Sequence, residues 1–171
     1  MSTEAARGKG FSRWAATATT TRAEALEHAV VSLVPQLESA GFRWVDKSFD
    51  CGIVPVHTIN LEREVVPGRV DYVQLNFDKR QRARFQVLFG SKEKGPPHRW
   101  VRSGALVWKK KSESVEYKWW GARWWHVDRE AALVQAINSL AVLLPQLLQF
   151  LSEGVAGQNV WAVTLNDSRA G

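Results

Sequence analysis

Hydrophobic residues recur at helical spacing near the start of the chain. The repeating positions, three or four residues apart, are Leu26, Val30, Leu33 and Leu37. This period predicts a helix over residues 21–40. Thr21 and Glu24 have the spacing of a capping box, and Gly41 is a typical C-terminal stop. Pro35 removes one backbone hydrogen bond inside the pattern, so we expect it to kink the helix or to split it into two short helices.

A second helical pattern is longer and more apolar. Asp128 is a good N-terminal cap and Gly154 a C-terminal stop, which predicts a helix over residues 128–153. Its apolar positions cover more than one stripe: Leu133, Ala136, Ile137, Leu140, Leu143, Leu144, Leu147, Leu148, Phe150 and Leu151. Such a helix is either buried on two sides or exposes apolar surface to a partner. Pro145 is expected to interrupt it, in a segment (LLPQL) that resembles the one around Pro35 (LVPQL) by coincidence.

Between the helices, apolar and polar residues alternate, which predicts strands. Residues 41–49 read as a turn that leads into a first strand. The further expected strands are residues 53–64, 70–77, 82–90, 99–108 and 114–120, with a candidate for a final strand at 158–165. In the strands expected at 70–77 and 82–90, the side chains expected to face the core are Val73, Leu75, Phe77, Ala83, Phe85, Val87 and Phe89. Residues 66–69 read as a Pro-Gly turn and 91–97 as a polar loop. The pattern predicts an α+β fold: an antiparallel meander of four to six strands, packed on one face by the two helices.

The length of 171 residues suits one globular domain with a sizeable core. We place this domain at residues 21–166, after a flexible basic tail at 1–20 and before a frayed end at 167–171. The start of the chain lacks the apolar segment of a secretory signal, and no apolar run reaches the ~18 residues that a membrane span needs. Cys51 is the one cysteine, which excludes an internal disulfide and fits a reducing compartment. We therefore expect a cytoplasmic protein without membrane contact.

Positive charge is concentrated in one region of the chain. The formal net charge is +6, but residues 78–129 contain 14 Lys and Arg against 5 Asp and Glu, while the remainder has a net charge of −3. A regional excess can form a patch that attracts phosphates or an acidic protein surface, or a basic face that is only solvated. The chain also contains nine tryptophans, a high number for its length.

Three segments carry a family resemblance: residues 37–42 (LESAGF), 58–61 (TINL) and 123–128 (RWWHVD). With the order of helix, turn, strand meander and apolar helix, they resemble the bacterial family known as domain of unknown function 4304, in which a similar Trp-Trp pair precedes the final helix. The resemblance spans residues 22–152. It implies an α+β fold, and it implies no activity because none is assigned to that family.

No motif for catalysis or cofactor binding is present in the sequence. The histidines, His28, His57, His98 and His126, lack metal-ligand spacing, and there is no CxxC, HExxH, GxSxG or phosphate-binding glycine motif. Asp46, Asp50, Cys51 and His57 are close to one another in the sequence. They form either a mixed metal site or an ordinary polar turn. Cys51 with His57 or His126 is the one cysteine arrangement for nucleophilic catalysis, and a buried thiol is its alternative. We expect no cofactor and no metal, and we favour a non-catalytic role.

Basic residues among aromatic ones point to a binding surface. Arg80, Arg82 and Arg84 alternate, so we expect them to project from one face of a strand. The turn Lys109, Lys110 and Lys111 is expected nearby, and the aromatic part of the surface is Trp119, Trp120, Trp124 and Trp125. Cations that follow phosphates and rings that stack on unpaired bases suit single-stranded nucleic acid. Tryptophans in strands are, however, commonly core residues.

A protein partner is the interpretation that we favour. Trp and Arg are enriched at interface hot spots, and the apolar second helix needs a partner layer that a homodimer can supply. We therefore predict a non-catalytic binding module that engages a protein, either an acidic surface or a second copy. Single-stranded nucleic-acid binding is the alternative, and an enzyme of unknown reaction is the second alternative. If Arg82 and Arg84 both face outward, exchanging both for glutamate should weaken binding and leave the fold intact.

Overall fold

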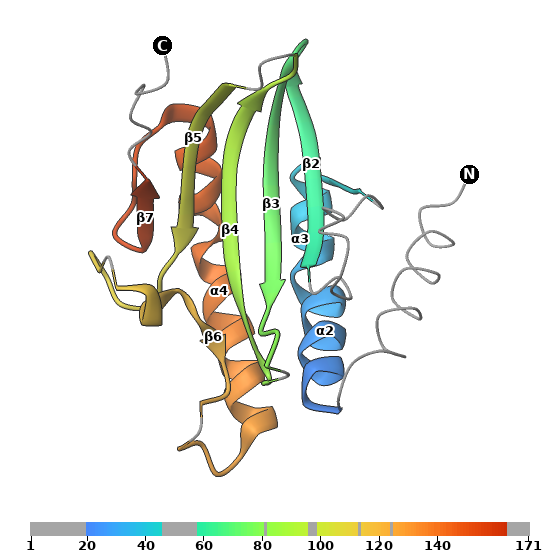
Figure 1. Ribbon diagram of the computed structural model, residues 1–171, viewed down its shortest axis with the longest axis vertical. Coiled ribbons are helices and arrows are strands. Elements are labelled where there is room, and N and C mark those ends of the chain that lie inside the picture. Colours follow the sequence, from blue (N-terminus) through green and yellow to red (C-terminus); the bar gives the residue numbers. More distant parts are fainter. Residues whose placement is uncertain are drawn as a thin grey trace.

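The computed structural model describes residues 20–45, 58–80, 82–95, 99–112, 114–123 and 125–163. The strands are β1 (Arg43–Trp44), β2 (Thr58–Val66), β3 (Arg69–Phe77), β4 (Arg84–Glu93), β5 (Arg99–Leu106), β6 (Trp120–Gly121) and β7 (Val160–Val163). The helices are α2 (Thr20–Ser32), α3 (Val34–Ser39), the 3₁₀-helix η1 (Val115–Lys118) and α4 (Arg129–Glu153). The sheet is antiparallel in the order β1-β2-β3-β4-β5-β7, and β6 pairs with β4 (Figure 1). The predicted meander is therefore confirmed for β2 to β5.

One face of the sheet carries the core. Alternate residues of β3 and β4 point to this face and are buried: Val73, Leu75, Phe77, Phe85, Val87 and Phe89. The helices α2 and α4 contribute Leu26, Leu140 and their neighbours to the same cluster, and both lie on one side of the sheet (Figure 1). Successive side chains of a strand point to opposite faces of the sheet. The alternating sequence pattern was therefore sufficient to predict this packing. The predicted α+β architecture is confirmed.

The two proline segments differ in structure. Leu33 separates α2 from α3, and Pro35 lies in the first turn of α3, where a missing N–H costs no intrahelical bond. The predicted split is confirmed. In contrast, α4 continues through Pro145, so the expected interruption there is wrong. Leu144 and Leu147, on either side of Pro145, are both buried in the core.

The ends of α4 are those that the sequence predicts. The Asp128 side chain accepts a hydrogen bond from the Ala131 amide at 2.9 Å, and Gly154 ends the helix in the left-handed conformation with φ 78°. By length and mean hydropathy alone, α4 could cross a membrane, which differs from our expectation that no segment is long and apolar enough. One side of this helix, including Leu140 and Phe150, is instead part of the core.

The predicted strand at 114–120 is wrong. Residues Val115–Lys118 form η1, and only Trp120–Gly121 are in a strand, which pairs with β4 and not with β5. The reason is tertiary: the Trp120 indole is buried and donates from Nε1 to the Leu106 carbonyl at 3.1 Å. The loop expected at 91–97 also begins later, because β4 continues to Glu93.

Two arginine side chains hold the C-terminal end of α4. Arg102 donates from Nη1 to the carbonyls of Phe150 at 2.7 Å and Leu151 at 3.0 Å, and Arg69 also donates to Leu151. Free carbonyls at a helix C-terminus carry partial negative charge, so cations stabilise that end. Part of the basic region predicted from the sequence, namely Arg102, therefore faces inward and adds little to a surface patch.

Several predicted features lie outside the described residues. They are the tail at 1–19, the Thr21 side chain of the capping box, the first part of the 53–64 strand, the 46–57 group with Asp46, Asp50, Cys51 and His57, and the end at 167–171.

Candidate functional site

The three arginines expected on one strand face do not share a face. β4 begins at Arg84, whereas Arg80 and Arg82 lie in the connection from β3 and are exposed. The prediction of a row of arginines on a strand is therefore wrong. The connection is organised by buried Asp78, which accepts a hydrogen bond from the Arg80 amide at 2.7 Å.

Arg84 is committed to intramolecular contacts. Its Nε lies 2.5 Å from the Asp78 carboxylate, and its Nη1 lies 4.0 Å from Glu116. The guanidinium carbon also lies 4.5 Å from the centroid of the Trp119 ring. With a buried carboxylate beside it and an indole over it, Arg84 is a structural residue and offers little charge to a partner.

The predicted tryptophans have different environments. Trp120 is only 4% exposed and belongs to the core, while Trp119 is half-buried under Arg84. Trp124 lies outside the described residues. Trp125 is 50% exposed, and Trp108, which precedes the lysine turn, is also exposed. Near the lysine turn, the exposed aromatic residues are therefore Trp108 and Trp125, while exposed Trp100 lies apart in β5.

A guanidinium lies between these two exposed indoles. The Arg123 carbon Cζ is 4.1 Å from the Trp108 ring centroid and 5.0 Å from that of Trp125. Tyr117 packs edge-on against Trp108 at 4.7 Å, and the Lys109 ammonium lies 4.9 Å from the Tyr117 ring. We call Trp108, Tyr117, Arg123 and Trp125 the tryptophan–arginine cluster. Stacking on two rings restricts the guanidinium and leaves its N–H donors available at the edges.

Backbone hydrogen bonds position the cluster. The Trp108 amide donates to the Tyr117 carbonyl at 3.0 Å, which joins the chain after β5 to η1. The Arg123 amide donates to His126 Nδ1 at 3.1 Å, and the His126 amide donates back to the Arg123 carbonyl. This small closed turn fixes the segment that carries Arg123 and Trp125. Accepting with Nδ1 requires that this nitrogen of His126 carries no proton.

A pocket of about 270 Å³ opens beside the cluster. It is lined by Trp108, Trp119, Trp120, Gly121, Arg123, Trp125, His126, Ala132, Gln135, Ala136 and Ser139. The lining is mostly apolar and aromatic with a few polar groups, which is the usual composition of a small binding site. Arg123 is the one charged residue in this lining, so the pocket suits a small anionic or aromatic group.

No carboxylate neutralises Arg123 within the described part of the chain. The ion pairs there involve Arg63, Arg84, Lys92 and Lys94. Arg123 was not among the site residues predicted from the sequence. Its position between exposed tryptophans depends on the turn at His126 and on the approach of Trp108 from β5, which no local pattern indicates.

The lysine turn is next to the cluster. Lys109, Lys110 and Lys111 are all exposed, and Lys111 has a positive φ of 53° at the tip of the turn. Nearby, the Lys118 ammonium lies over the Trp161 ring, and burial lowers the pKa of this lysine. The three predicted lysines are therefore exposed, in contrast to Arg84, and Lys109 contacts Tyr117.

No metal-binding group of three or more His, Cys, Asp or Glu side chains occurs in the residues that the structure covers. The candidate mixed site at 46–57 lies outside them.

Comparison with protein-family models, with curated proteins and with solved structures finds no match to this chain. The resemblance to the domain of unknown function 4304 family therefore stays a prediction.

Proposed function

We propose that this protein is a non-catalytic binding module and that the tryptophan–arginine cluster receives an acidic group of a protein partner. The observation that carries the proposal is the Arg123 guanidinium, held between the Trp108 and Trp125 rings without a carboxylate partner among the described residues. A guanidinium fixed in this way has lost much of its conformational freedom before binding.

The chemistry of the pocket favours a carboxylate. Planar guanidinium donors match a carboxylate in a two-bond arrangement, and these charge-assisted bonds are stronger than neutral ones. The surrounding indoles exclude water and so strengthen the ion pair, while half-exposed Trp125 offers an apolar surface to neighbouring atoms of the partner. Exposed Lys109, Lys110 and Lys111 add attraction at longer range.

A protein fits better than a nucleic acid because the basic surface is small. Beyond the pocket, the first turn of α4 carries Asp128 and Glu130, and no Lys or Arg occurs between Glu130 and Glu153. A phosphate backbone that leaves the pocket along α4 would meet Asp128 and Glu130 against the single cation Arg129, and no Lys or Arg after it in the helix. A protein segment of mixed charge has no such conflict.

Single-stranded nucleic acid is the second candidate for the ligand, and one observation favours it. The exposed lysine turn and half-exposed Trp125 together offer cations and a stacking face. Phosphate binding would depend steeply on salt and on all three lysines. Binding of one carboxylate depends mainly on Arg123.

Fluorescence titration separates these candidates. The probes are a glutamate-rich peptide and a thymidine oligonucleotide, each titrated at two salt concentrations. For the peptide, Arg123→Gln should weaken binding about tenfold or more, because it removes a charge-assisted contact. Arg99→Gln, which changes an exposed arginine at the start of β5, is the matched control and should change affinity less than about twofold.

Two outcomes decide against the proposal. Equal peptide affinity of the wild type and Arg123→Gln would remove the cluster as the site. Preference for the oligonucleotide, with a loss on Lys109→Gln/Lys110→Gln/Lys111→Gln and none on Arg123→Gln, would replace the acidic protein partner with nucleic acid.

A further inference from the structure

The outer side of α4 carries a stripe of uncharged residues that is symmetrical about Asn138. At four residues before and after it are Val134 and Val142, and at seven residues before and after it are Ala131 and Pro145. In an α-helix, positions four and seven residues away lie within roughly 40° of the central one, so these five residues share one face. All five are exposed.

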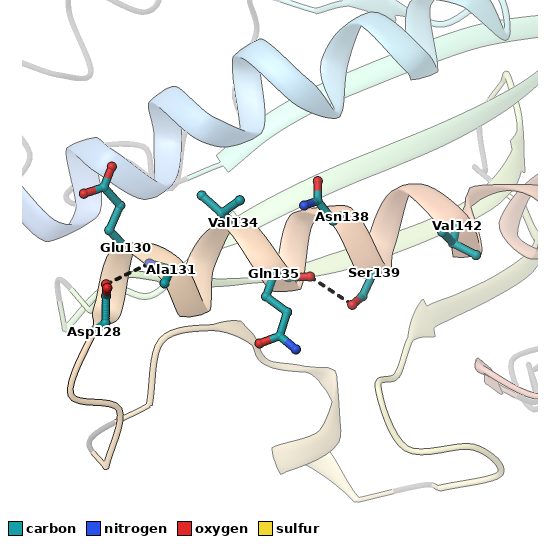
Figure 2. Close-up of a pocket in the computed structure, with 8 residues that line it drawn as sticks. All are labelled: Asp128, Glu130, Ala131, Val134, Gln135, Asn138, Ser139 and Val142. Atoms are coloured by element: carbon teal, nitrogen blue, oxygen red, sulfur yellow. Dashed lines mark hydrogen bonds between the residues drawn. The ribbon is translucent and has the colours of Figure 1, made fainter.

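This stripe is unusual for a surface that faces only water. Val142 is 76% exposed and Val134 is 38% exposed. β-Branched residues are poor helix formers, and an apolar side chain exposed to water does not stabilise the helix. The surface forms an open groove of about 700 Å³ (Figure 2). It is lined by Asp128, Glu130, Ala131, Val134, Gln135, Asn138, Ser139 and Val142, with charge confined to its first turn. Figure 2 views α4 from the side away from the sheet, and α2 runs alongside it.

We propose that this groove is the interface of a homodimer in which α4 packs against α4 of a second copy in antiparallel orientation. A two-fold axis at Asn138 places Val134 opposite Val142 of the second copy, and Ala131 opposite Pro145. Each apolar residue then meets an apolar residue, and each valine pair is formed twice. This self-complementarity is the condition that a two-fold interface must satisfy.

At the axis, the two Asn138 side chains meet. A carboxamide both donates and accepts hydrogen bonds, so a symmetrical pair satisfies itself. A single polar residue within an apolar helix seam fixes the register, because any shift would bury the amide without a partner. The position of Asn138 therefore selects one alignment among those that the valines alone would allow.

Charge decides between the two orientations. In the antiparallel arrangement, Glu130 lies opposite Gln146, eight residues on the other side of Asn138. In a parallel arrangement, Glu130 would face Glu130, and the two positive helix N-termini would lie together. The antiparallel dimer also aligns the helix dipoles favourably.

A lipid surface is the other occupant that an apolar helix face suggests, and α4 lacks the chemistry for it. Interfacial helices carry Lys and Arg beside the apolar face to hold lipid phosphates. Arg129 is the one basic residue of α4, and the groove begins with Asp128 and Glu130.

Sedimentation equilibrium over a range of protein concentrations tests the dimer. The wild type should reach twice the 19.3 kDa mass of one chain. Val134→Glu and Val142→Lys should each raise the dimer dissociation constant about 100-fold, because each buries two unpaired charges. Val31→Glu makes the same kind of change at an exposed valine of α2, which is 69% exposed, and should leave the dimer intact.

The double variant Val134→Glu/Val142→Lys tests the orientation. In the antiparallel dimer each introduced glutamate faces an introduced lysine, so the dimer should return. In a parallel dimer like charges face each other, and the double variant should stay monomeric. Circular dichroism checks that every variant is folded.

A wild type that stays monomeric at the highest soluble concentration overturns the proposal, as does a double variant that fails to dimerise. Binding of the monomer to vesicles of anionic phospholipid, lost in Val134→Glu, would assign the groove to a membrane instead. Arg123→Gln should dimerise normally. The dimer and the function proposed for the tryptophan–arginine cluster can therefore be tested independently of each other.

Discussion

Arg63 and Asp71 form a two-bond ion pair between β2 and β3. One Asp71 oxygen accepts from Arg63 Nε at 3.2 Å and Nη2 at 3.0 Å, and the other accepts from the Ser91 hydroxyl. Arg63 also donates from Nη1 to the Ala40 carbonyl at 3.0 Å. The pair therefore links three strands of the sheet to the end of α3.

Asp71→Ala should destabilise the protein by about 3 kcal/mol. Asp71 is 1% exposed, and its removal leaves Arg63 without its counter-charge. Because the Arg63 side chain still reaches water, we expect the lower end of the range for broken buried pairs. Urea denaturation measures the loss. Glu64→Gln, which breaks the exposed pair with Lys94 at 3.1 Å, is the control and should lower the stability much less, because exposed ion pairs contribute little. Equal losses would mean that the Arg63–Asp71 pair has no special role.

Arg82→Glu and Arg84→Glu should differ in stability, which revises the expectation that both leave the fold intact. Arg84→Glu places a carboxylate beside buried Asp78 and near Glu116, so it should cost about 3–5 kcal/mol. Arg82 is exposed, and its exchange should stay within about 0.5 kcal/mol. Thermal unfolding of the two single variants measures this difference. If Arg84→Glu is as stable as the wild type, the contact with Asp78 does not contribute.

Tyr72 should make the fold sensitive to alkali. Burial raises the pKa of its hydroxyl above the usual 10.0, and a hydrogen bond with Ser103 offsets part of this rise. The folded state then retains a proton that the unfolded chain has lost. The resulting stabilisation is fully present below pH 10.0 and is lost as the pH rises through the folded-state pKa.

Tyr72→Phe should remove this alkaline loss. Phenylalanine retains the edge-on ring contact with Trp100, whose centroid is 5.4 Å away, but has no proton to lose. The melting temperature of the variant should therefore fall less between neutral and alkaline pH than that of the wild type. The same decrease in both proteins would show that Tyr72 does not control it.

Gly121→Ala should disturb the tryptophan–arginine cluster. Gly121 has a φ of 115°, and a Cβ there would collide with the carbonyl of Ala83, the residue directly before β4. Gly68, at the β2–β3 turn, also has a positive φ of 85°, but a Cβ there would meet no atom within 4 Å. We expect Gly68→Ala to lower the free energy of unfolding by about 1 kcal/mol. Gly121→Ala should lower it by more and should also weaken peptide binding. Calorimetry and the fluorescence titration measure the two effects, and equal costs would contradict the role of the Ala83 contact.

The sequence by itself determined the elements that depend on local periodicity and on caps. Asp128 and Gly154 marked the ends of α4 because a side-chain cap and a left-handed glycine act within one turn. Alternation predicted which residues of β3 and β4 face the core, since strand geometry has a period of two.

Only the tertiary structure decided the features that depend on contacts between segments far apart in the sequence: helix continuity at proline, tryptophan burial and the neutralisation of arginine. Two similar segments around Pro35 and Pro145 end in a split and in a continuous helix, although both are flanked by buried residues of the same core, so the local sequence does not distinguish them. Consecutive Trp119 and Trp120 differ in burial: Trp120 lies in the core and donates to the Leu106 carbonyl, whereas Trp119 is half-buried beside Arg84. Buried Asp78 neutralises Arg84, whereas Arg123 lies beside two indoles and has no carboxylate partner among the described residues. Charge and aromatic content can be counted along the chain, but their availability to a partner depends on contacts between segments far apart in it.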